Sequence, residues 1–410
     1  MEQHKNSTRK MLLMMITGAM IIFFTGFVHI WTVYQPYVTL ETGWPEKQAS
    51  MGFYFSCCAF VLGNIAGGRL QNKVKPRVIL FIGGGLLSLA VFLSSLCLSR
   101  SLVGFWMTYG VMQGFGQGMA YTVVLAAAQK WFPERTGFAS GVIVTSNGLC
   151  GFFMVPLSRY LLAQNGPKTA LITVSGLIAV ACILSVLFFS LPEQEEKKDE
   201  KKDWGVQKQY TSAELLRSRK YYLVVGAMFF GLLPYYMISP FSQTFLIEHG
   251  VSEGIAATAV MIGSLMNAST RLLLPTLSDK IGKIRCIAAN FILLIITMLI
   301  LANGSSLILA AAVVLTYVCF GGVMGSFPSL TSYIFGMKHF GENYGFVMFG
   351  LIAASLGASS LRSLLAGIGL TVSQTFWVGA ALALAAFLCM TALGRLAEKF
   401  GYVCSDIKTE

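Results

Sequence analysis

Residues 275–283 of this chain read PTLSDKIGK, and a related stretch, GRLQNKVKPR, stands at residues 68–77. Each is a short polar segment between two long apolar runs. Aligned on Asn72 and Asp279, the two stretches are 207 residues apart. A second pair of turns, residues 131–137 (WFPERTG) and residues 336–345, matches at an offset of 208. Two independent matches at nearly one offset predict that the chain consists of two related halves.

The apolar runs around these turns predict a membrane protein. Hydrophobic residues make up 55% of the chain and charged residues only 12%, whereas soluble domains carry about 25% charged residues. A spanning helix needs about 20 apolar residues, and the first run, residues 11–38, is too long for a cleaved signal peptide. The sequence therefore predicts an all-α fold of twelve transmembrane helices in two pseudo-symmetric six-helix bundles, near residues 11–38, 48–70, 76–98, 102–129, 138–163, 170–191, 221–247, 254–275, 284–302, 306–335, 345–368 and 373–394.

The distribution of charged residues predicts where the chain divides into two bundles and how it is oriented in the membrane. We expect an N-terminal bundle at residues 1–192, a cytoplasmic linker at 193–220 with a short surface helix near 212–219, and a C-terminal bundle with a short tail at 221–410. With both termini and the linker in the cytoplasm, 24 of the 30 Lys and Arg residues fall on cytoplasmic segments. This asymmetry follows the positive-inside rule, so the net charge of +12 indicates topology in the cell membrane rather than a nucleic-acid partner.

Arg271 is the most informative residue for function. It stands in the apolar stretch 263–274, where a guanidinium costs about 2.5–3.5 kcal/mol at a helix centre in a bilayer. None of the 18 acidic residues lies deep in a predicted helix, so an anionic substrate is the natural counter-charge, bound in bidentate geometry. A purely structural arginine, held by backbone carbonyls, is the alternative. Arg362 lies further toward the outer surface, which favours a snorkelling or entrance role.

Both repeated loops resemble the pattern G-x-L-x-D-[RK]-x-G-[RK] of the major facilitator superfamily. Within it, the chain is similar to the oxalate/formate antiporter family, which is related to the monocarboxylate transporters. The similarity rests on Gly26 with WTVY at 31–34, on KWFPERTG at 130–137, on Asn267 and Arg271 with SDKIG at 278–282, and on the segments FPS at 327–329 and NYG at 343–345.

The resemblance implies a monomeric secondary transporter in the lipid bilayer, in which Arg271 binds the substrate carboxylate and Tyr121 donates a hydrogen bond in the cavity. Several positions differ from the oxalate carrier. Leu351 replaces a lysine, His29 and Asn147 replace tyrosines, and Phe320 and Met324 replace an aromatic pair. Asn267 stands where the monocarboxylate transporters carry an aspartate. With Leu351 uncharged, Arg271 is the sole central cation, which favours a monoanion. Tyr34, Tyr235, Tyr236 and Tyr317 are weaker candidates for the cavity wall.

We expect polar and charged residues of the repeated turns to take part in gating: Asn72, Lys73, Arg77, Arg135, Asp279 and Lys280. The expected substrate is a small organic monocarboxylate such as formate, lactate or pyruvate, moved by exchange or with a proton carried by His29. An exporter of a neutral or cationic compound and a non-transporting sensor are the alternatives. The nine cysteines form no CxxC, and no His/Cys cluster has metal-ligand spacing, so neither a metal nor a redox role is indicated. The sequence shows no nucleophile–His–acid arrangement, and neither a cofactor nor an enzyme is expected.

Overall fold

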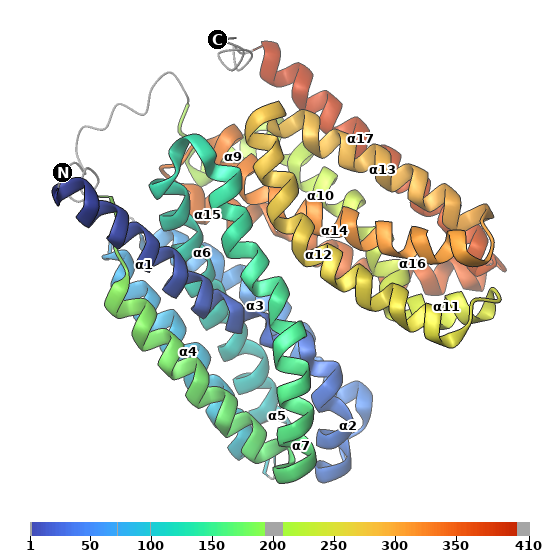
Figure 1. Cartoon of the computed structure of the whole chain (residues 1–410), viewed down its shortest axis with the longest axis horizontal. Helices are drawn as coiled ribbons and strands as arrows, with labels where there is room; N and C mark the ends of the chain where they lie inside the picture. Colours follow the sequence, from blue (N-terminus) through green and yellow to red (C-terminus); the bar gives the residue numbers. More distant parts are fainter. Residues whose placement is uncertain (1, 72, 99, 193–207, 400–410) are drawn as a thin grey trace. The chain divides into compact units, whose positions relative to one another are not determined.

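The computed structural model describes residues 2–71, 73–98, 100–192 and 208–399, and within these ranges every regular element is helical (Figure 1). Ten helices of the described part are long and apolar enough to cross a membrane. The predicted all-α membrane fold is therefore confirmed. Asn72 and most of the predicted linker lie outside the described residues.

The helices of the first half follow the predicted spans but are divided differently. The first predicted helix consists of α1, a 3₁₀ segment η1 and α2, and the fourth consists of α5, a π-helical segment η2 and α6. The elements are α1 (Glu2–Thr25), η1 (Gly26–Ile30), α2 (Trp31–Thr42), α3 (Glu46–Leu70), α4 (Pro76–Cys97), α5 (Leu102–Phe105), η2 (Trp106–Met112), α6 (Gln113–Trp131), η3 (Pro133–Arg135) and α7 (Thr136–Phe188).

The length of α7 has a local cause. Gly166 inside it has φ 72° and ψ 173° and is followed by Pro167. Positive φ is open to glycine at little cost, and proline cannot continue the hydrogen-bond ladder of the preceding turn. The two residues therefore form the sharp turn between the fifth and sixth predicted helices, which α7 covers together.

The second half contains the remaining elements. The predicted surface helix near 212–219 is present as α9, which begins with a capping box between Thr211 and Glu214. The elements are α9 (Ser212–Arg217), α10 (Arg219–Ile238), η4 (Ser239–Phe241), α11 (Ser242–Glu248), α12 (Glu253–Ile281), α13 (Lys283–Asn303), α14 (Ser306–Phe335), α15 (Phe340–Val347), α16 (Phe349–Gly367) and α17 (Val372–Lys399).

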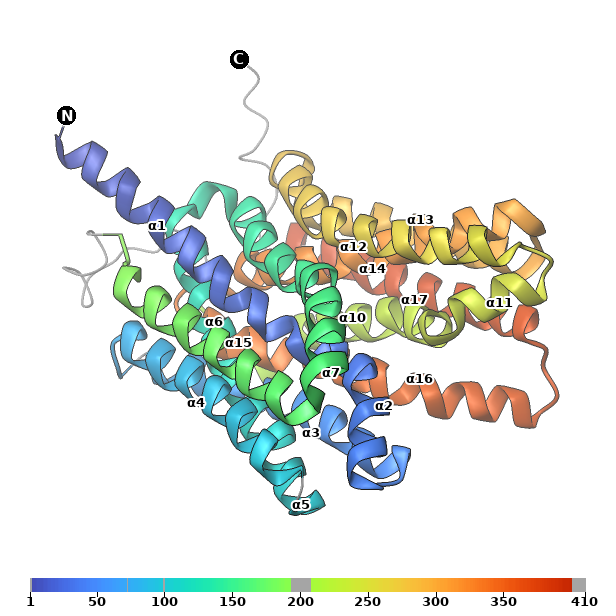
Figure 2. The ribbon, with the colours of Figure 1, turned by 60° about the horizontal axis from the view of Figure 1, so that its bottom comes forward.

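The contacts divide the chain into two units. Unit 1 contains residues 1–209 and 335–346, and unit 2 contains residues 210–334 and 347–410. In unit 1, α7 packs on α1 and α4, and α3 and α4 pack on α6 (Figure 1). In unit 2, α13 packs on α12 and α17, and α10 packs on α16 and α17 (Figure 2).

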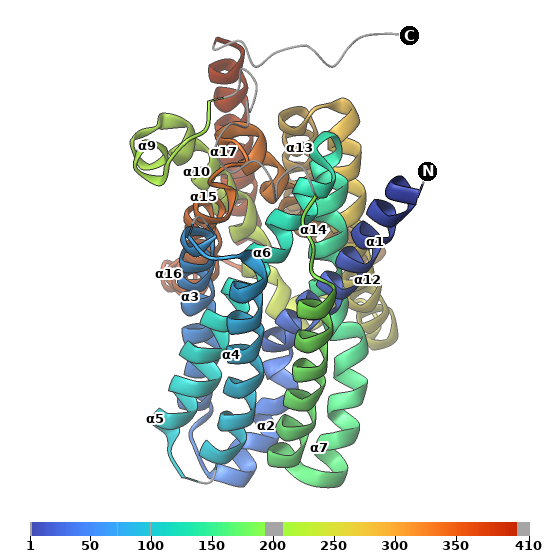
Figure 3. The ribbon, with the colours of Figure 1, turned by 90° about the vertical axis from the view of Figure 1, so that its left-hand side faces the viewer.

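Most of α15 belongs to unit 1 although it follows α14 in sequence. It lies beside the end of α3 (Figure 3), where a methyl group on Gly68 would overlap the Glu342 backbone nitrogen. The Arg69 guanidinium donates to the Glu342 carboxylate beside this contact. The predicted division placed residues 335–346 with the C-terminal bundle, so the docking of this segment is a structural finding beyond the sequence.

Glycines allow one pair of helices in each unit to approach at backbone distance. In unit 2, methyl groups on Gly321 and Gly325 of α14 would overlap the carbonyl oxygens of Asn267 and Arg271 on α12. Small residues at this four-residue spacing are typical of close helix packing in membranes. The position of the Arg271 backbone therefore depends on the absence of a side chain at Gly325.

Unit 1 contains the counterpart of this contact. Methyl groups on Gly114 and Gly118 of α6 would overlap the carbonyl oxygens of Ser56 and Phe60 on α3. The pairs 114/118 and 321/325 are 207 residues apart, which equals the offset of the repeated loops. The repeat seen in the sequence is thus also a repeat of helix packing inside each unit.

Candidate functional site

Arg271 is buried in the middle of α12 and is oriented by the residue one turn before it. Its exposed fraction is 7%, and its Nε donates a hydrogen bond of 3.1 Å to Oδ1 of Asn267. A guanidinium carries five N–H donors in a planar fork, so a hydrogen bond at Nε fixes the plane in which the Nη donors lie. Two of the predicted substrate-binding residues, Asn267 and Arg271, are therefore in direct contact within unit 2, and their contact with substrate stays a prediction.

An aromatic wall from two other helices covers the guanidinium. The Cζ atom of Arg271 lies 5.9 Å from the centroid of the Phe320 ring on α14. Phe320 stacks in turn on Tyr235 of α10, with ring centroids 3.8 Å apart and an interplanar angle of 20°. Such a cation–π contact is strengthened when the cation is removed from water.

Two further tyrosines complete this wall. Tyr236 meets the Phe320 ring edge-on at 5.6 Å, and Tyr317 meets Tyr235 edge-on at 5.2 Å. Gly263 on α12 leaves room for Tyr317, because a methyl group there would lie 3.0 Å from the ring. We call these residues the Arg271 cluster: Arg271, Asn267, Phe320, Tyr235, Tyr236 and Tyr317. The cluster combines one buried cation, one amide, three phenols and an apolar ring, a set suited to a small organic anion.

Met324 and Leu351 are the other predicted site residues of unit 2. Both side chains are half-buried, on α14 and α16 respectively. Met324 directly precedes Gly325, which lies against the Arg271 backbone. Neither side chain carries charge, so they add apolar surface and no counter-ion. Their contact with substrate stays a prediction.

The candidates of unit 1 lie around the break in helix one. The 3₁₀ segment η1 (Gly26–Ile30) places His29 at an exposed position, with its ring 6.4 Å from that of Phe53. Asn147 on α7 donates through Nδ2 to the Thr25 hydroxyl at 3.0 Å. A methyl group on Gly26 would overlap the Asn147 carbonyl oxygen. Asn147 of α7 therefore contacts the helix break through both its side chain and its backbone.

Tyr121 and Tyr34 are buried inside unit 1. Tyr121 on α6 is 3% exposed and lies parallel to Tyr344 of α15, with ring centroids 6.4 Å apart. Tyr34 on α2 has no exposed surface, and its hydroxyl donates to Ser158 at 3.1 Å. That bond satisfies the Tyr34 hydroxyl within the bundle, so Tyr34 shows a packing role here. The inclusion of His29, Asn147, Tyr121 and Tyr34 in one site with Arg271 stays a prediction.

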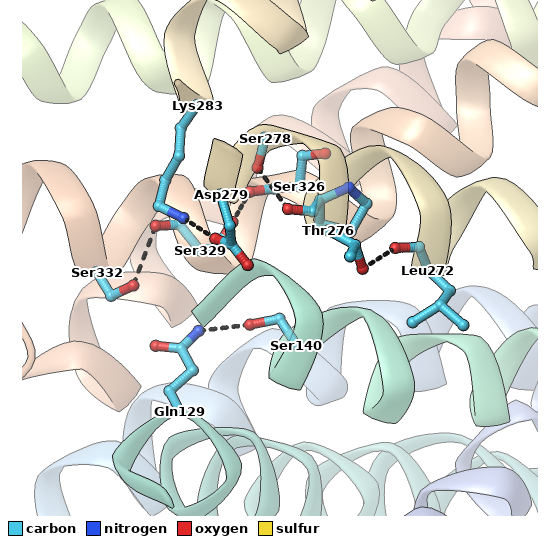
Figure 4. Close-up of polar contacts among 11 residues, drawn as sticks. Gln129, Ser140, Leu272, Thr276, Ser278, Asp279, Lys283, Ser326, Ser329 and Ser332 are labelled. Carbon is cyan, nitrogen blue, oxygen red and sulfur yellow. Dashed lines mark hydrogen bonds and ion pairs between the residues drawn. The ribbon is translucent and has the colours of Figure 1, made fainter. Parts of the chain in front are cut away.

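The predicted gating residues that the structure describes lie at helix ends or in the turns beside them, in both units. In unit 2, Lys283 donates to Oδ1 of Asp279 at 2.6 Å (Figure 4), and Lys280 beside them is exposed. In unit 1, Nη2 of Arg77 donates to the Leu187 carbonyl at 3.0 Å, whereas Lys73 and Arg135 are exposed. Lys283 was not among the predicted residues, although its spacing of four from Asp279 is the usual signal of a helical ion pair.

Several buried serines of α14 lie near Asp279 and Lys283 (Figure 4). Ser329 and Ser332 each donate to the carbonyl three residues earlier, at 3.0 Å in both cases (Figure 4). These bonds satisfy the hydroxyls of Ser329 and Ser332 within their own helix, so α14 tolerates these two serines in buried positions.

The family model of the Major Facilitator Superfamily matches residues 15–360, which is most of the chain. The chain belongs to the major facilitator superfamily. Members of this superfamily are membrane transporters, and the chain is a multi-pass membrane protein of this superfamily.

Three relatives are similar over most of their length. The chain is 29% identical over 342 residues to the MFS-type transporter YhjX of Escherichia coli strain K12, covering 82% of this chain and 83% of the relative. It is 26% identical over 350 residues to the oxalate:formate antiporter of Oxalobacter formigenes, covering 83% and 81%. It is 26% identical over 404 residues to the apicoplast pyruvate carrier 1 of Toxoplasma gondii, covering 82% and 74%. The predicted membership in the major facilitator superfamily is thus confirmed, and its relatives include an oxalate:formate antiporter and a pyruvate carrier.

The fold also resembles solved transporters of the superfamily. The outward-conformation structure of the transporter FucP superposes with a TM-score of 0.72 at 14% sequence identity, covering 94% of this chain and 99% of that one. At this identity the likeness establishes the fold alone.

Proposed function

We propose that this chain is a secondary transporter that moves small organic monocarboxylates across the cell membrane by alternating access, with Arg271 as the group that binds the carboxylate. The observation that carries the proposal is the burial of Arg271 in a membrane helix, oriented by Asn267 and covered by Phe320. The names of two relatives support it, because oxalate, formate and pyruvate are all carboxylates.

The chemistry of the Arg271 cluster favours a carboxylate over other small ligands. A guanidinium and a carboxylate form two parallel hydrogen bonds, and the low dielectric of a closed membrane site strengthens their attraction relative to water. Tyrosine hydroxyls can donate to the remaining acceptor sites of the anion. The apolar ring of Phe320 suits the short carbon skeleton of lactate or pyruvate.

The number of central cations limits the charge of the substrate. Leu351 offers an apolar side chain where the similar oxalate carrier has a lysine, so Arg271 supplies one positive charge to the site. A dianion such as oxalate would leave one negative charge uncompensated in a site of low dielectric. We therefore assign the site to monoanions.

The positive charge of Arg271 also determines how transport in one direction is coupled to transport in the other. An occupied site neutralises Arg271 and allows reorientation, whereas an empty site leaves a buried cation and disfavours it. Obligatory exchange results, unless the exposed His29 carries a proton. In this scheme the polar and charged residues of the repeated turns close the cytoplasmic gate, namely Asn72, Lys73, Arg77, Arg135, Asp279 and Lys280. Both termini are cytoplasmic, and the chain acts as a monomer.

A thermal-shift panel on the purified wild-type protein tests the ligand class. Binding raises the free energy of unfolding by RT ln(1 + [L]/Kd), about 2.7 kcal/mol at a ligand concentration of ~100 Kd. We expect formate, lactate and pyruvate to raise the melting temperature, oxalate to raise it less, and sodium chloride at equal ionic strength to have no effect.

The same measurements distinguish the proposed function from two competing functions. Stabilisation by a lipophilic cation or a neutral drug, with no response to any carboxylate, would favour an exporter in which Arg271 is structural. Stabilisation by a carboxylate without flux in liposomes would instead favour a non-transporting sensor.

A further inference from the structure

A second arginine of unit 2 lies directly on an aromatic ring. The Cζ atom of Arg362 on α16 is 3.4 Å from the centroid of the Phe241 ring in η4. Arg362 is half-buried, and Phe241 is 44% exposed. Among the residues that the structure describes, no hydrogen bond or ion pair engages Arg362. Its charge is therefore positioned by a ring and is not neutralised by a described carboxylate.

The direction of α10 and α16 places this stack relative to the Arg271 cluster. Gly350 contacts Val225 and Met228, and Gly357 contacts Phe229 and Leu233. Positions that increase together along both helices show that α10 and α16 run parallel. Phe241 comes six residues after Tyr235, which is about 9 Å along a helix axis. The stack thus lies beyond the Arg271 cluster, past the end of α10 at Ile238.

The geometry of the stack leaves Arg362 suited to meet an anion. A guanidinium stacked on a ring offers its N–H donors at its edge, and Arg keeps its charge under all ordinary conditions. A ring that fixes the guanidinium also removes much of the entropy loss of binding. An arginine that merely reaches the lipid headgroups would extend away from the helix bundle, whereas Arg362 lies against the neighbouring helix end of its own unit.

We infer that Arg362 and Phe241 form an outer capture site for carboxylates, which a substrate occupies before it reaches Arg271. The inference rests on the proposed function. On the predicted topology the stack lies on the non-cytoplasmic side, so it serves substrates that arrive from that side. A cation at such a position raises the local concentration of anions and the rate at which they enter.

Vesicles of defined orientation test the capture site. Initial rates of pyruvate or formate uptake are measured against substrate concentration in right-side-out and inside-out membrane vesicles at low ionic strength. For Arg362→Gln we expect KM to rise about fivefold in right-side-out vesicles and by less than about twofold in inside-out vesicles, with the maximal rate little changed. Phe241→Leu should raise KM in the same orientation to a smaller extent, and Arg362→Lys should stay nearer to wild type because the charge is retained.

Salt supplies a second readout, and Arg159 supplies the control. The difference between wild type and Arg362→Gln should shrink from 0.01 M to 0.15 M salt, because the screening length falls from ~30 Å to ~8 Å. Arg159→Gln removes an exposed arginine of α7 and should leave KM unchanged in both orientations.

Several results would overturn the inference while leaving the proposed function intact. These are a wild-type KM for Arg362→Gln in both orientations, an equal rise in both orientations, or a rise that follows the anionic lipid content of the vesicles rather than substrate concentration. If Arg362→Gln does not fold, an unchanged KM for Phe241→Leu overturns it. Absence of carboxylate uptake by the wild type would instead refute the proposed function.

Discussion

Arg271→Ala is expected to lower the initial rate of monocarboxylate uptake at least about a hundredfold. Hydrogen bonds to charged groups contribute about 1.5–3 kcal/mol each, and a bidentate pair provides two of them. Each 1.4 kcal/mol is about a factor of ten in affinity. The rate is measured with a labelled monocarboxylate in liposomes that contain the purified variant.

Arg271→Lys separates charge from geometry. Lysine keeps the positive charge but cannot form the planar fork, and it loses the bond from Nε to Asn267. We expect measurable binding with a strongly raised KM. Arg271→Ala should keep a melting temperature near that of the wild type without ligand, because replacing a buried cation by a neutral residue removes a desolvation cost. Arg159→Ala, on the exposed face of α7, is the control and should transport normally. Unchanged uptake by Arg271→Ala would show that Arg271 is structural.

Gly325→Ala is expected to destabilise the protein and to impair substrate binding together. The added methyl group overlaps the Arg271 carbonyl oxygen, so α14 must move away from α12. Overpacking of this kind costs about 1–3 kcal/mol. The melting temperature and the ligand-induced thermal shift measure the two effects.

Gly118→Ala is the matched control for this prediction. Its methyl group overlaps the Phe60 carbonyl oxygen at the equivalent contact of unit 1, far in sequence from the Arg271 cluster. We expect a similar loss of stability, but the folded protein should keep its ligand-induced shift. Gly85→Ala, where nothing lies within 4 Å of the added atom, should be neutral or slightly stabilising. Equal loss of ligand response in Gly325→Ala and Gly118→Ala would contradict a specific role for α14 in positioning Arg271.

The positions of the helices could be predicted from the sequence because each span is a long apolar run. Their internal breaks could not. The 3₁₀ segment at Gly26–Ile30 depends on how closely Gly26 packs against α7, which is a tertiary contact. The π-helical segment Trp106–Met112 likewise lies inside an unbroken apolar run and carries no local signal of its own.

The centre of the candidate site could also be predicted, because Arg271 is conspicuous in an apolar helix and Asn267 lies one turn before it. The aromatic wall was only partly predictable. Tyr235, Tyr236 and Tyr317 were weaker candidates, since a membrane tyrosine often packs or lies at the interface. The stack of Arg362 on Phe241 and the pair of Arg69 with Glu342 join residues far apart in sequence, and no pattern in either segment indicates its partner.

Exchange is the property that distinguishes this account most clearly from a transporter with a structural arginine. The measurement is the uptake of labelled pyruvate or formate into liposomes that contain the wild-type protein and are either empty or preloaded with the unlabelled anion. We expect preloading to raise the initial rate about tenfold or more, since reorientation of an empty site carries the positive charge of Arg271 through the membrane without a bound anion. Uptake of a neutral or cationic compound in liposomes that show no carboxylate uptake, with or without preloading, would contradict the account.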